Sequence, residues 1–451
     1  MAKAIQTDLT KGHVSRRLMR YALPIVAANL LQSVYNIVDM VIAGHFIGSD
    51  GISAIGNAGL VSGFLTSIAI GFAVGGNVLI GQYFGSGEEE DRRSASGTLF
   101  SFCIGGGLLI GLIVFFSAEP ILRLLGAPAL AKAVIYLRTV AVSLVFVTGY
   151  NGLSAILRAM GNSKAPMVCI VTSTVTNVAL DLLFVAGLDM GVFGAALATA
   201  ISQCTAFLLA LGFVLRHRAE LGFYPRYLKA DSHKLRRIVK LGFPIALQSA
   251  IGTISWLAVM VLINKYGVDV SAGNGVSNKI KEFCQVFIAA MQSAAATMAA
   301  QNLGVGEYDR AKSVMRFCLR LTLLSSLVMI GICQLFAPAL VSVFTDESAA
   351  ADAAVANLRI EIVAQVFYAG FMSFNVLALA AGDTGFVMWN SFLNCIVVRI
   401  VLAVLLEHFF GIRGVYIACA IAPSVSVPVG YFYYRSGKWK KRLTGKIPVK
   451  A

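Results

Sequence analysis

A carboxylate inside a long apolar stretch is the first feature of this sequence that could do chemistry. Asp181 lies in the apolar run 167–188, and Asn177 precedes it by four residues, so on a helix the two side chains share one face. If the run crosses a bilayer, the acid costs roughly 2.5–3.5 kcal/mol on insertion scales, and such residues usually have a functional role. We therefore interpret the pair as part of a cation or proton site.

Two further polar groups, Asp39 and Thr199, are expected at a comparable depth in other apolar runs. With a rise of about 1.5 Å per residue, Asp39, Asp181, Thr199 and Asn177 lie roughly 8, 9, 12 and 15 Å from the same ends of their helices. Two carboxylates, an amide oxygen and a hydroxyl are hard oxygen ligands that suit Na⁺. Neighbouring carboxylates also disfavour each other's ionisation, which suits proton uptake and release. The alternative is a buried hydrogen-bonded network that only fixes packing.

Other polar and aromatic side chains are candidates for a substrate cavity. Asn29, Gln32, Asn36 and Asp39 recur at spacings of three or four residues, which predicts one polar helix face turned toward protein or water. Lys279 and Glu282 are spaced to pair on a helix, and aromatic rings can stack on lipophilic cations. A structural ion pair and ordinary packing remain the alternatives for these residues. The candidates for the cavity are Gln32, Tyr35, Asn36, Trp256, Lys279, Glu282 and Arg399.

The composition predicts an all-α polytopic membrane protein. Hydrophobic residues make up 58% of the 451 and charged residues only 13%, whereas soluble domains average roughly 25% charged. About twelve apolar runs reach the length of about 20 residues that a spanning helix needs. The net charge of +15 comes from Lys and Arg that gather in alternate loops. This pattern indicates cytoplasmic loops and termini rather than nucleic-acid binding.

An internal repeat divides the chain. Two segments ending at Pro24-Ile25 and Pro244-Ile245 match at an offset of 220 residues, and 82–88 matches 301–307 at an offset of 219. We predict two parallel repeats of six helices, as in secondary transporters whose halves enclose a substrate path. The expected parts are a first lobe over 1–216, a cytoplasmic linker over 217–235, a second lobe over 236–435 and a basic cytoplasmic tail over 436–451.

The repeat also provides an internal comparison for the acidic residues. The offset of 220 places Val259 opposite Asp39 and Cys419 opposite Thr199, and Asn177 has a counterpart in Asn394. The second half therefore lacks acids at these positions. This difference favours a functional site in the first lobe.

The sequence resembles the multidrug and toxic compound extrusion (MATE) family over essentially its whole length. The motifs that carry the resemblance are Tyr35-Asn36-Ile-Val-Asp39-Met-Val-Ile-Ala-Gly44 and Leu157-Arg158-Ala-Met-Gly161-Asn-Ser-Lys164-Ala-Pro166. The chain is similar to the DinF-like and MepA-like bacterial branch, because the stretch from Ile362 to Ala381 contains no carboxylate, whereas the NorM-like branch has acids in the second lobe. The resemblance implies that Asp39, Asn177, Asp181 and Thr199 bind the coupling cation, and that Pro24 bends the first helix.

The expected function is secondary active efflux of amphipathic or cationic compounds against H⁺ or Na⁺ by alternating access. A lipid-linked oligosaccharide flippase of related architecture is the alternative, which Arg399 and the lysines near 280 keep open. The sequence has no zinc-protease or P-loop motif, so we expect no enzyme and no cofactor beyond a coupling ion. We expect a monomer in the bacterial inner membrane, with both termini in the cytoplasm, small drug-like substrates and the lipid bilayer as partners, and no nucleic acid.

Overall fold

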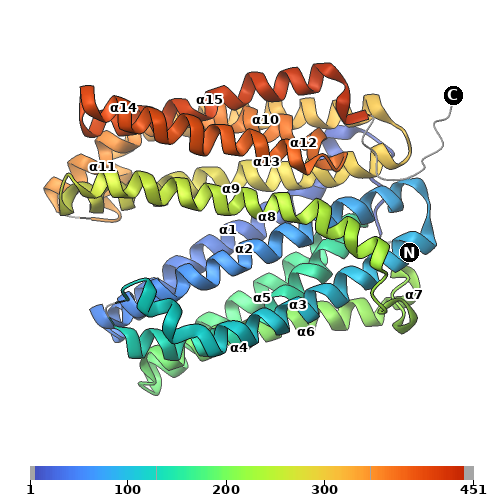
Figure 1. The fold of residues 1–451 in the computed structure, drawn as a ribbon, viewed down its shortest axis with the longest axis horizontal. Helices are drawn as coiled ribbons and strands as arrows, with labels where there is room; N and C mark the ends of the chain where they lie inside the picture. Colours follow the sequence, from blue (N-terminus) through green and yellow to red (C-terminus); the bar gives the residue numbers. More distant parts are fainter. Residues whose placement is uncertain (1–5, 128, 346, 441–451) are drawn as a thin grey trace. The chain divides into compact units, whose positions relative to one another are not determined.

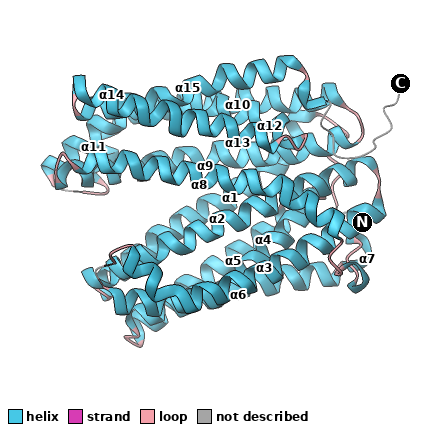
Figure 2. Cartoon of the chain, in the orientation of Figure 1, coloured by secondary structure: helices cyan, strands magenta, loops and turns pink. Residues whose placement is uncertain are grey.

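The computed structural model describes residues 6–127, 129–345 and 347–440, apart from the side chains of 36, 37, 40, 41, 43, 44, 49, 50 and 52. Within these ranges the chain is helical, with short turns and no β-strand (Figure 2). This confirms the all-α prediction.

The first half of the chain forms long helices joined by short turns (Figure 1). The fifth of these changes from α-helical to π-helical hydrogen bonding directly after Asp181. In chain order the elements are α1 (Val14–Phe46), α2 (Ser49–Ser86), α3 (Glu89–Leu124), α4 (Leu130–Ala159), α5 (Lys164–Asp181), the π-helix η1 (Leu182–Gly187), α6 (Gly191–Arg216), the short α7 (Arg218–Leu221) and the 3₁₀ turn η2 (Pro225–Tyr227).

The second half repeats this plan, with a π-helix again in its fifth span. The elements are α8 (Ser232–Asn264), α9 (Val268–Gly304), α10 (Tyr308–Ser342), α11 (Ser348–Glu361), α12 (Ala364–Ala380), α13 (Thr384–Phe392), the π-helix η3 (Leu393–Ile400), α14 (Val401–Phe410), α15 (Ile412–Ser436) and the 3₁₀ turn η4 (Lys438–Lys440). Each repeat therefore has a π-helix in its fifth span, although the two segments are not aligned residue by residue.

The described residues contain ten helical segments long and apolar enough to cross a membrane. The pair α11 and α12, which is bent by 47° at its break, gives an eleventh span if it is counted as one. The remaining long helix of the described chain is α1, which contains several of the residues whose side chains are not described. The protein is a multi-pass helical membrane protein.

A turn shared by the two repeats supports the duplication. After α2 the chain turns at Gly87, with a φ of 77°, and the N–H of Glu88 donates to the Tyr83 carbonyl at 3.2 Å. After α9 it turns at Gly306, with a φ of 81°, and the N–H of Glu307 donates to the Asn302 carbonyl at 2.9 Å. A positive φ of this size favours glycine, so the same sequence pattern produces the same helix ending twice.

The chain divides into two compact units that do not coincide with its two halves. The first unit contains 23–246 together with 1–8, and the second contains 247–451 together with 9–22. Both α1 and α8 therefore begin in one unit and continue in the other. In each helix the boundary between the two units lies within two residues of a proline, Pro24 in α1 and Pro244 in α8, and the repeat aligns these two prolines. α1 continues through Pro24 as a single helix.

Within the first unit, glycines let the start of α8 approach α2 closely. A Cβ atom on Gly75 would lie 2.6 Å from the backbone nitrogen of Gly242, and one on Gly71 would lie 2.6 Å from that of Ala246. Small residues four apart allow such backbone contact between spanning helices.

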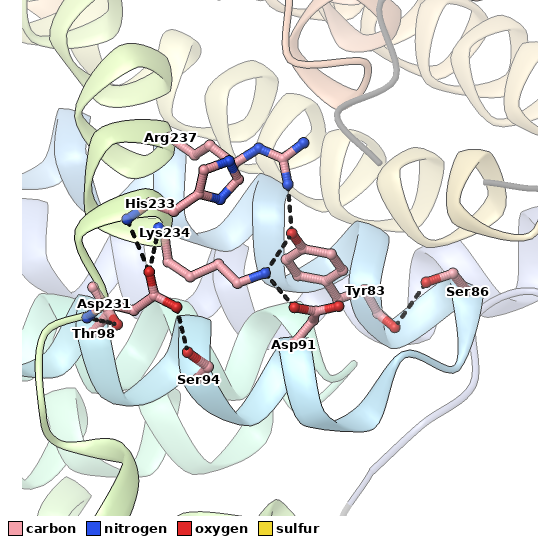
Figure 3. A network of polar contacts seen from close by, with 9 residues as sticks. All are labelled: Tyr83, Ser86, Asp91, Ser94, Thr98, Asp231, His233, Lys234 and Arg237. Atoms are coloured by element: carbon pink, nitrogen blue, oxygen red, sulfur yellow. Dashed lines mark hydrogen bonds and ion pairs between the residues drawn. The ribbon is translucent and has the colours of Figure 1, made fainter. Parts of the chain in front are cut away.

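Polar contacts hold the same end of α8 (Figure 3). Lys234 forms an ion pair with Asp91 of α3 and donates to the Tyr83 hydroxyl of α2 at 3.0 Å. Arg237 donates to the same hydroxyl at 2.6 Å. The segment before α8, which the sequence predicts to be a linker, also buries Leu221 and Phe223 in the apolar core of the first unit.

Candidate functional site

The four residues expected to bind a cation meet inside the first unit, where α1 carries Asp39, α5 carries Asn177 and Asp181, and α6 carries Thr199. The carboxyl groups of Asp39 and Asp181 are close enough to interact directly. Asn177 and Asp181 are each only 1% exposed. We call these four residues the acidic site.

The amide of Asn177 connects the members of the acidic site. With its nitrogen turned toward Asp181, it donates to Asp181 Oδ2 at 3.0 Å, and its oxygen accepts from the backbone N–H of Thr199 at 3.3 Å. The Thr199 hydroxyl donates to the Ala195 carbonyl at 3.0 Å, which leaves its oxygen lone pairs for other groups. The other carboxylate oxygen, Asp181 Oδ1, is buried and has no hydrogen-bond partner among the described residues. A buried carboxylate oxygen of this kind requires a proton or a cation.

Two tyrosines complete the surroundings of the acidic site. Tyr35 of α1 and Tyr136 of α4 each interact with Asp39, Asp181 and the side chain of Thr199. Tyr35 was expected in the substrate cavity from the sequence, whereas Tyr136 was missed. The only signal for Tyr136 was a phenol near the start of an apolar run, which many buried tyrosines share.

The π-helix η1 begins at the residue after Asp181. Here the N–H of Leu188 donates to the carbonyl of Leu183, five residues earlier, at 2.9 Å. The wider turn changes the direction of the side chains on the two sides of the segment. π-helical turns are rare and are frequent at functional sites, and this one adjoins the buried acid.

The residues expected in a substrate cavity belong to both units, some to the first and some to the second. Gln32 is exposed, and the side chain of Asn36 lies outside the described residues. In the second unit, Lys279 Nζ and Glu282 Oε2 form the expected ion pair at 3.2 Å, and both side chains are exposed. Arg399 is half-buried, and its Nε has no hydrogen-bond partner among the described atoms. Trp256 lies beside Lys281, whose Nζ is 5.8 Å from the ring centre.

The second unit also contains a buried carboxylate that the sequence analysis missed. Glu361 forms an ion pair with Lys281, and the two side chains are 6% and 8% exposed. The second half lacks acids at the positions aligned with the acidic site, and this buried carboxylate lies elsewhere in it. Glu361 lies inside the expected span over 352–381, but its partner lies 80 residues away, so sequence spacing gave no sign of the pair.

A repeated set of membrane-spanning helices with a buried acidic site in one of two units defines the class of secondary transporters. The family model named MatE matches residues 24–183 and 244–405, one match in each repeat. The chain therefore belongs to the MatE family, the multidrug and toxic compound extrusion transporters.

Individual relatives extend over nearly the whole chain. The probable multidrug resistance protein YoeA of Bacillus subtilis is 29% identical over 452 residues, which covers 97% of each protein. The multidrug export protein MepA of Staphylococcus saprophyticus is 25% identical and covers 92% of each. A solved structure described as the outward-facing conformation of a multidrug resistance MATE family transporter of the MOP superfamily superposes with a TM-score of 0.91. It is 21% identical and covers 98% of this chain and 99% of that one.

Proposed function

We propose that the protein exports amphipathic, often cationic, compounds in exchange for H⁺ or Na⁺, and that the acidic site binds the coupling ion. The observation that carries this proposal is the interacting pair of Asp39 and the buried Asp181, whose Oδ1 has no hydrogen-bond partner among the described residues. Two interacting carboxyl groups favour a bound proton or cation, so the occupancy of the site follows the ion gradient.

Each residue of the acidic site has a distinct part in this proposal. Asp39 and Asp181 provide the negative charge and, for H⁺ coupling, the proton acceptor. Asn177 holds Asp181 in place and, with Thr199, supplies neutral oxygens for a bound Na⁺. Binding shifts the equilibrium between inward-open and outward-open conformations only if the ion binds one of them more tightly, which is the condition for coupling.

The curated relatives support the substrate class, because their names describe multidrug resistance and multidrug export. We propose a monomer in the bacterial cytoplasmic membrane with both termini in the cytoplasm, in agreement with the alternating distribution of Lys and Arg. We place the lobes at 1–216 and 236–435, and Pro24 serves as a hinge because proline removes one backbone hydrogen bond of the helix.

The decisive experiment is dye efflux from vesicles that contain the purified protein, with the pH gradient and the Na⁺ gradient imposed separately. Asp181→Asn keeps the size of the side chain and removes its charge, so we expect gradient-driven efflux to fall to the background of empty vesicles. The gradient that drives wild-type efflux identifies the coupling ion.

The matched control is Glu119→Gln in the same unit, because Glu119 is an exposed acid whose ion pair with Arg123 lies outside the acidic site. It should retain wild-type efflux. Wild-type efflux by Asp181→Asn at equal protein content would refute the proposal. Transport of lipid-linked oligosaccharide without dye efflux would instead favour the flippase.

A further inference from the structure

The buried Glu361 lies where a membrane-spanning segment of the second unit is broken. It is the last residue of α11, and α12 begins at Ala364 after a bend of 47°. A break at membrane depth interrupts the regular hydrogen bonding of a helix, and it persists only where the freed polar groups are buried in protein or line a cavity. Broken spans are where secondary transporters commonly hold their ions.

Lys281 of α9 provides the positive charge at this break. Its ammonium group pairs with Glu361 Oε2, and its Nζ also lies 5.8 Å from the centre of the Trp256 ring. An aromatic face attracts a cation of any kind. The surroundings of the Lys281 nitrogen, one carboxylate oxygen and one aromatic face, are therefore those of a cation-binding site.

Two residues on either side of the break, four apart in the sequence, carry oxygen atoms without hydrogen-bond partners. Glu361 Oε1 and Gln365 Oε1 are both buried and unpartnered among the described residues. The phenol of Tyr416 is close to Glu361 and Asn357. Both ends of the Asn357 amide have partners, since it accepts from Ser277 at 2.8 Å and donates to Asn274 at 2.9 Å. The Glu361 carboxylate thus faces one ammonium group and retains a free oxygen.

In the repeat alignment this cluster corresponds in position to the acidic site. Cys419, which the repeat aligns with Thr199, interacts with Glu361, Lys281 and Arg399. Both units therefore hold a buried carboxylate near the same part of their sixth span. Among the described residues, neither Asp39 nor Asp181 forms an ion pair with a cationic side chain, whereas Glu361 pairs with Lys281 of its own chain.

We propose that Lys281 is the resident cation of a carboxylate site in the second unit, where its ammonium group occupies the place that a free monovalent cation or a proton would otherwise take. The tethered charge keeps Glu361 neutralised at all times. As a result, external cations act on the protein only by binding to the acidic site of the first unit. This inference goes beyond the proposed function, because it assigns a site and a selectivity role to residues that the coupling reaction does not use.

Removal of the tethered ammonium tests the proposal. Lys281→Ala leaves a space the size of propylammonium beside a buried carboxylate, which must then acquire another cation. The substitution is made together with Asp181→Asn, so that cation binding at the acidic site does not contribute. The melting temperature of the purified protein is measured in choline chloride, sodium chloride and propylammonium chloride at equal ionic strength and pH 8. A second series in choline chloride lowers the pH to 6.

We expect Asp181→Asn/Lys281→Ala to melt several degrees below Asp181→Asn in choline chloride. Sodium, propylammonium or the lower pH should restore the melting temperature, with saturation for the two ions. The charged and titratable groups that interact with Glu361 are Lys281, Tyr416 and Cys419. Arg399 interacts with Cys419 and belongs to the same surroundings.

Addition of Glu361→Gln to the double variant should remove the cation and pH effects, because no carboxylate remains to be neutralised. Lys279→Ala is the matched control, since Lys279 pairs with Glu282 at the exposed surface, and it should show no rescue. A melting temperature that no cation and no pH change restores, or failure of the double variant to fold under every condition, would overturn the proposal. The measurement needs no transport, so it is independent of whether the proposed efflux function is correct.

Discussion

At the scale of residues, the acidic site depends on how one buried amide is oriented. Asn177 contacts both the Asp181 carboxylate and the backbone of Thr199, so it fixes the separation between α5 and α6 at this point. A hydrogen bond to a charged group contributes roughly 1.5–3 kcal/mol. The loss of this bond should therefore weaken the bound state without removing either carboxylate.

We predict that Asn177→Ala weakens the apparent affinity for the coupling ion by about tenfold or more, since each 1.4 kcal/mol corresponds to about a factor of ten. The measurement is the initial rate of dye efflux as a function of the concentration of the driving ion. The maximal rate should change less than the concentration that gives half of it.

Asn151→Ala provides the comparison for this prediction, because Asn151 donates to the Val147 carbonyl of its own helix and lies outside the acidic site. Its ion dependence should match the wild type. Equal ion affinity in Asn177→Ala and the wild type would show that the amide only fills space.

At the scale of elements, the start of α8 is held by a capped helix end. Asp231 Oδ1 accepts from the backbone N–H groups of His233 at 2.8 Å and Lys234 at 3.2 Å, and its backbone N–H donates to Thr98 at 3.1 Å. These contacts, drawn in Figure 3, join the segment before α8 to α3. The Lys234 N–H, followed by that of His233, lowers the pKa of Asp231 below its ordinary value, and burial opposes this only in part.

A lowered pKa in the folded protein means that the ionised form stabilises the fold. This stabilisation is present above the unfolded pKa of about 3.9 and is lost as the pH falls through the lower folded value. We predict that Asp231→Ala costs about 1 kcal/mol at neutral pH, the usual value of a helix cap. The difference from the wild type should shrink below about pH 4.

Melting temperatures of both proteins between about pH 7 and pH 3 test this cap. The exposed Asp352 gives the control, because Asp352→Ala removes an acid from α11 without removing a cap contact. A constant difference between Asp231→Ala and the wild type over the whole pH range would contradict the role of the charge.

At the scale of the whole molecule, each compact unit contains residues from both sides of the linker. Residues 9–22 belong to the second unit, and residues 232–246 of α8 belong to the first. Each isolated half of the sequence therefore lacks a piece of its own unit. The close backbone contact of Gly75 with Gly242 is one of the interactions that an isolated first half would lose.

We predict that the halves 1–224 and 225–451 support efflux when they are expressed together and do not accumulate when either is expressed alone. The cut lies in the segment between α7 and η2, so it interrupts no long helix. Immunoblots of membranes and dye efflux by cells measure both outcomes. A half that accumulates by itself in a stable form would show that the exchanged segments are dispensable.

The sequence alone determined the membrane class, the repeat and the residues of the acidic site. Membrane insertion responds to the length and polarity of a single segment, and Asn177 and Asp181 share a helix face through local spacing. The depth estimate then grouped Asp39 and Thr199 with them, because the depth of a residue in every span is counted from the same face of the membrane. These features depend on short stretches of chain, which a sequence displays directly.

Only the tertiary structure showed which helix faces meet. Tyr136 joins the acidic site through the packing of α4, Lys281 meets Glu361 from a different helix 80 residues away, and α1 and α8 pass between units near their prolines. In a membrane, nearly every face of a helix is apolar enough to be buried, so polarity patterns do not specify helix partners. Side-chain packing and the pairing of buried charges make that choice, and both are properties of the folded chain.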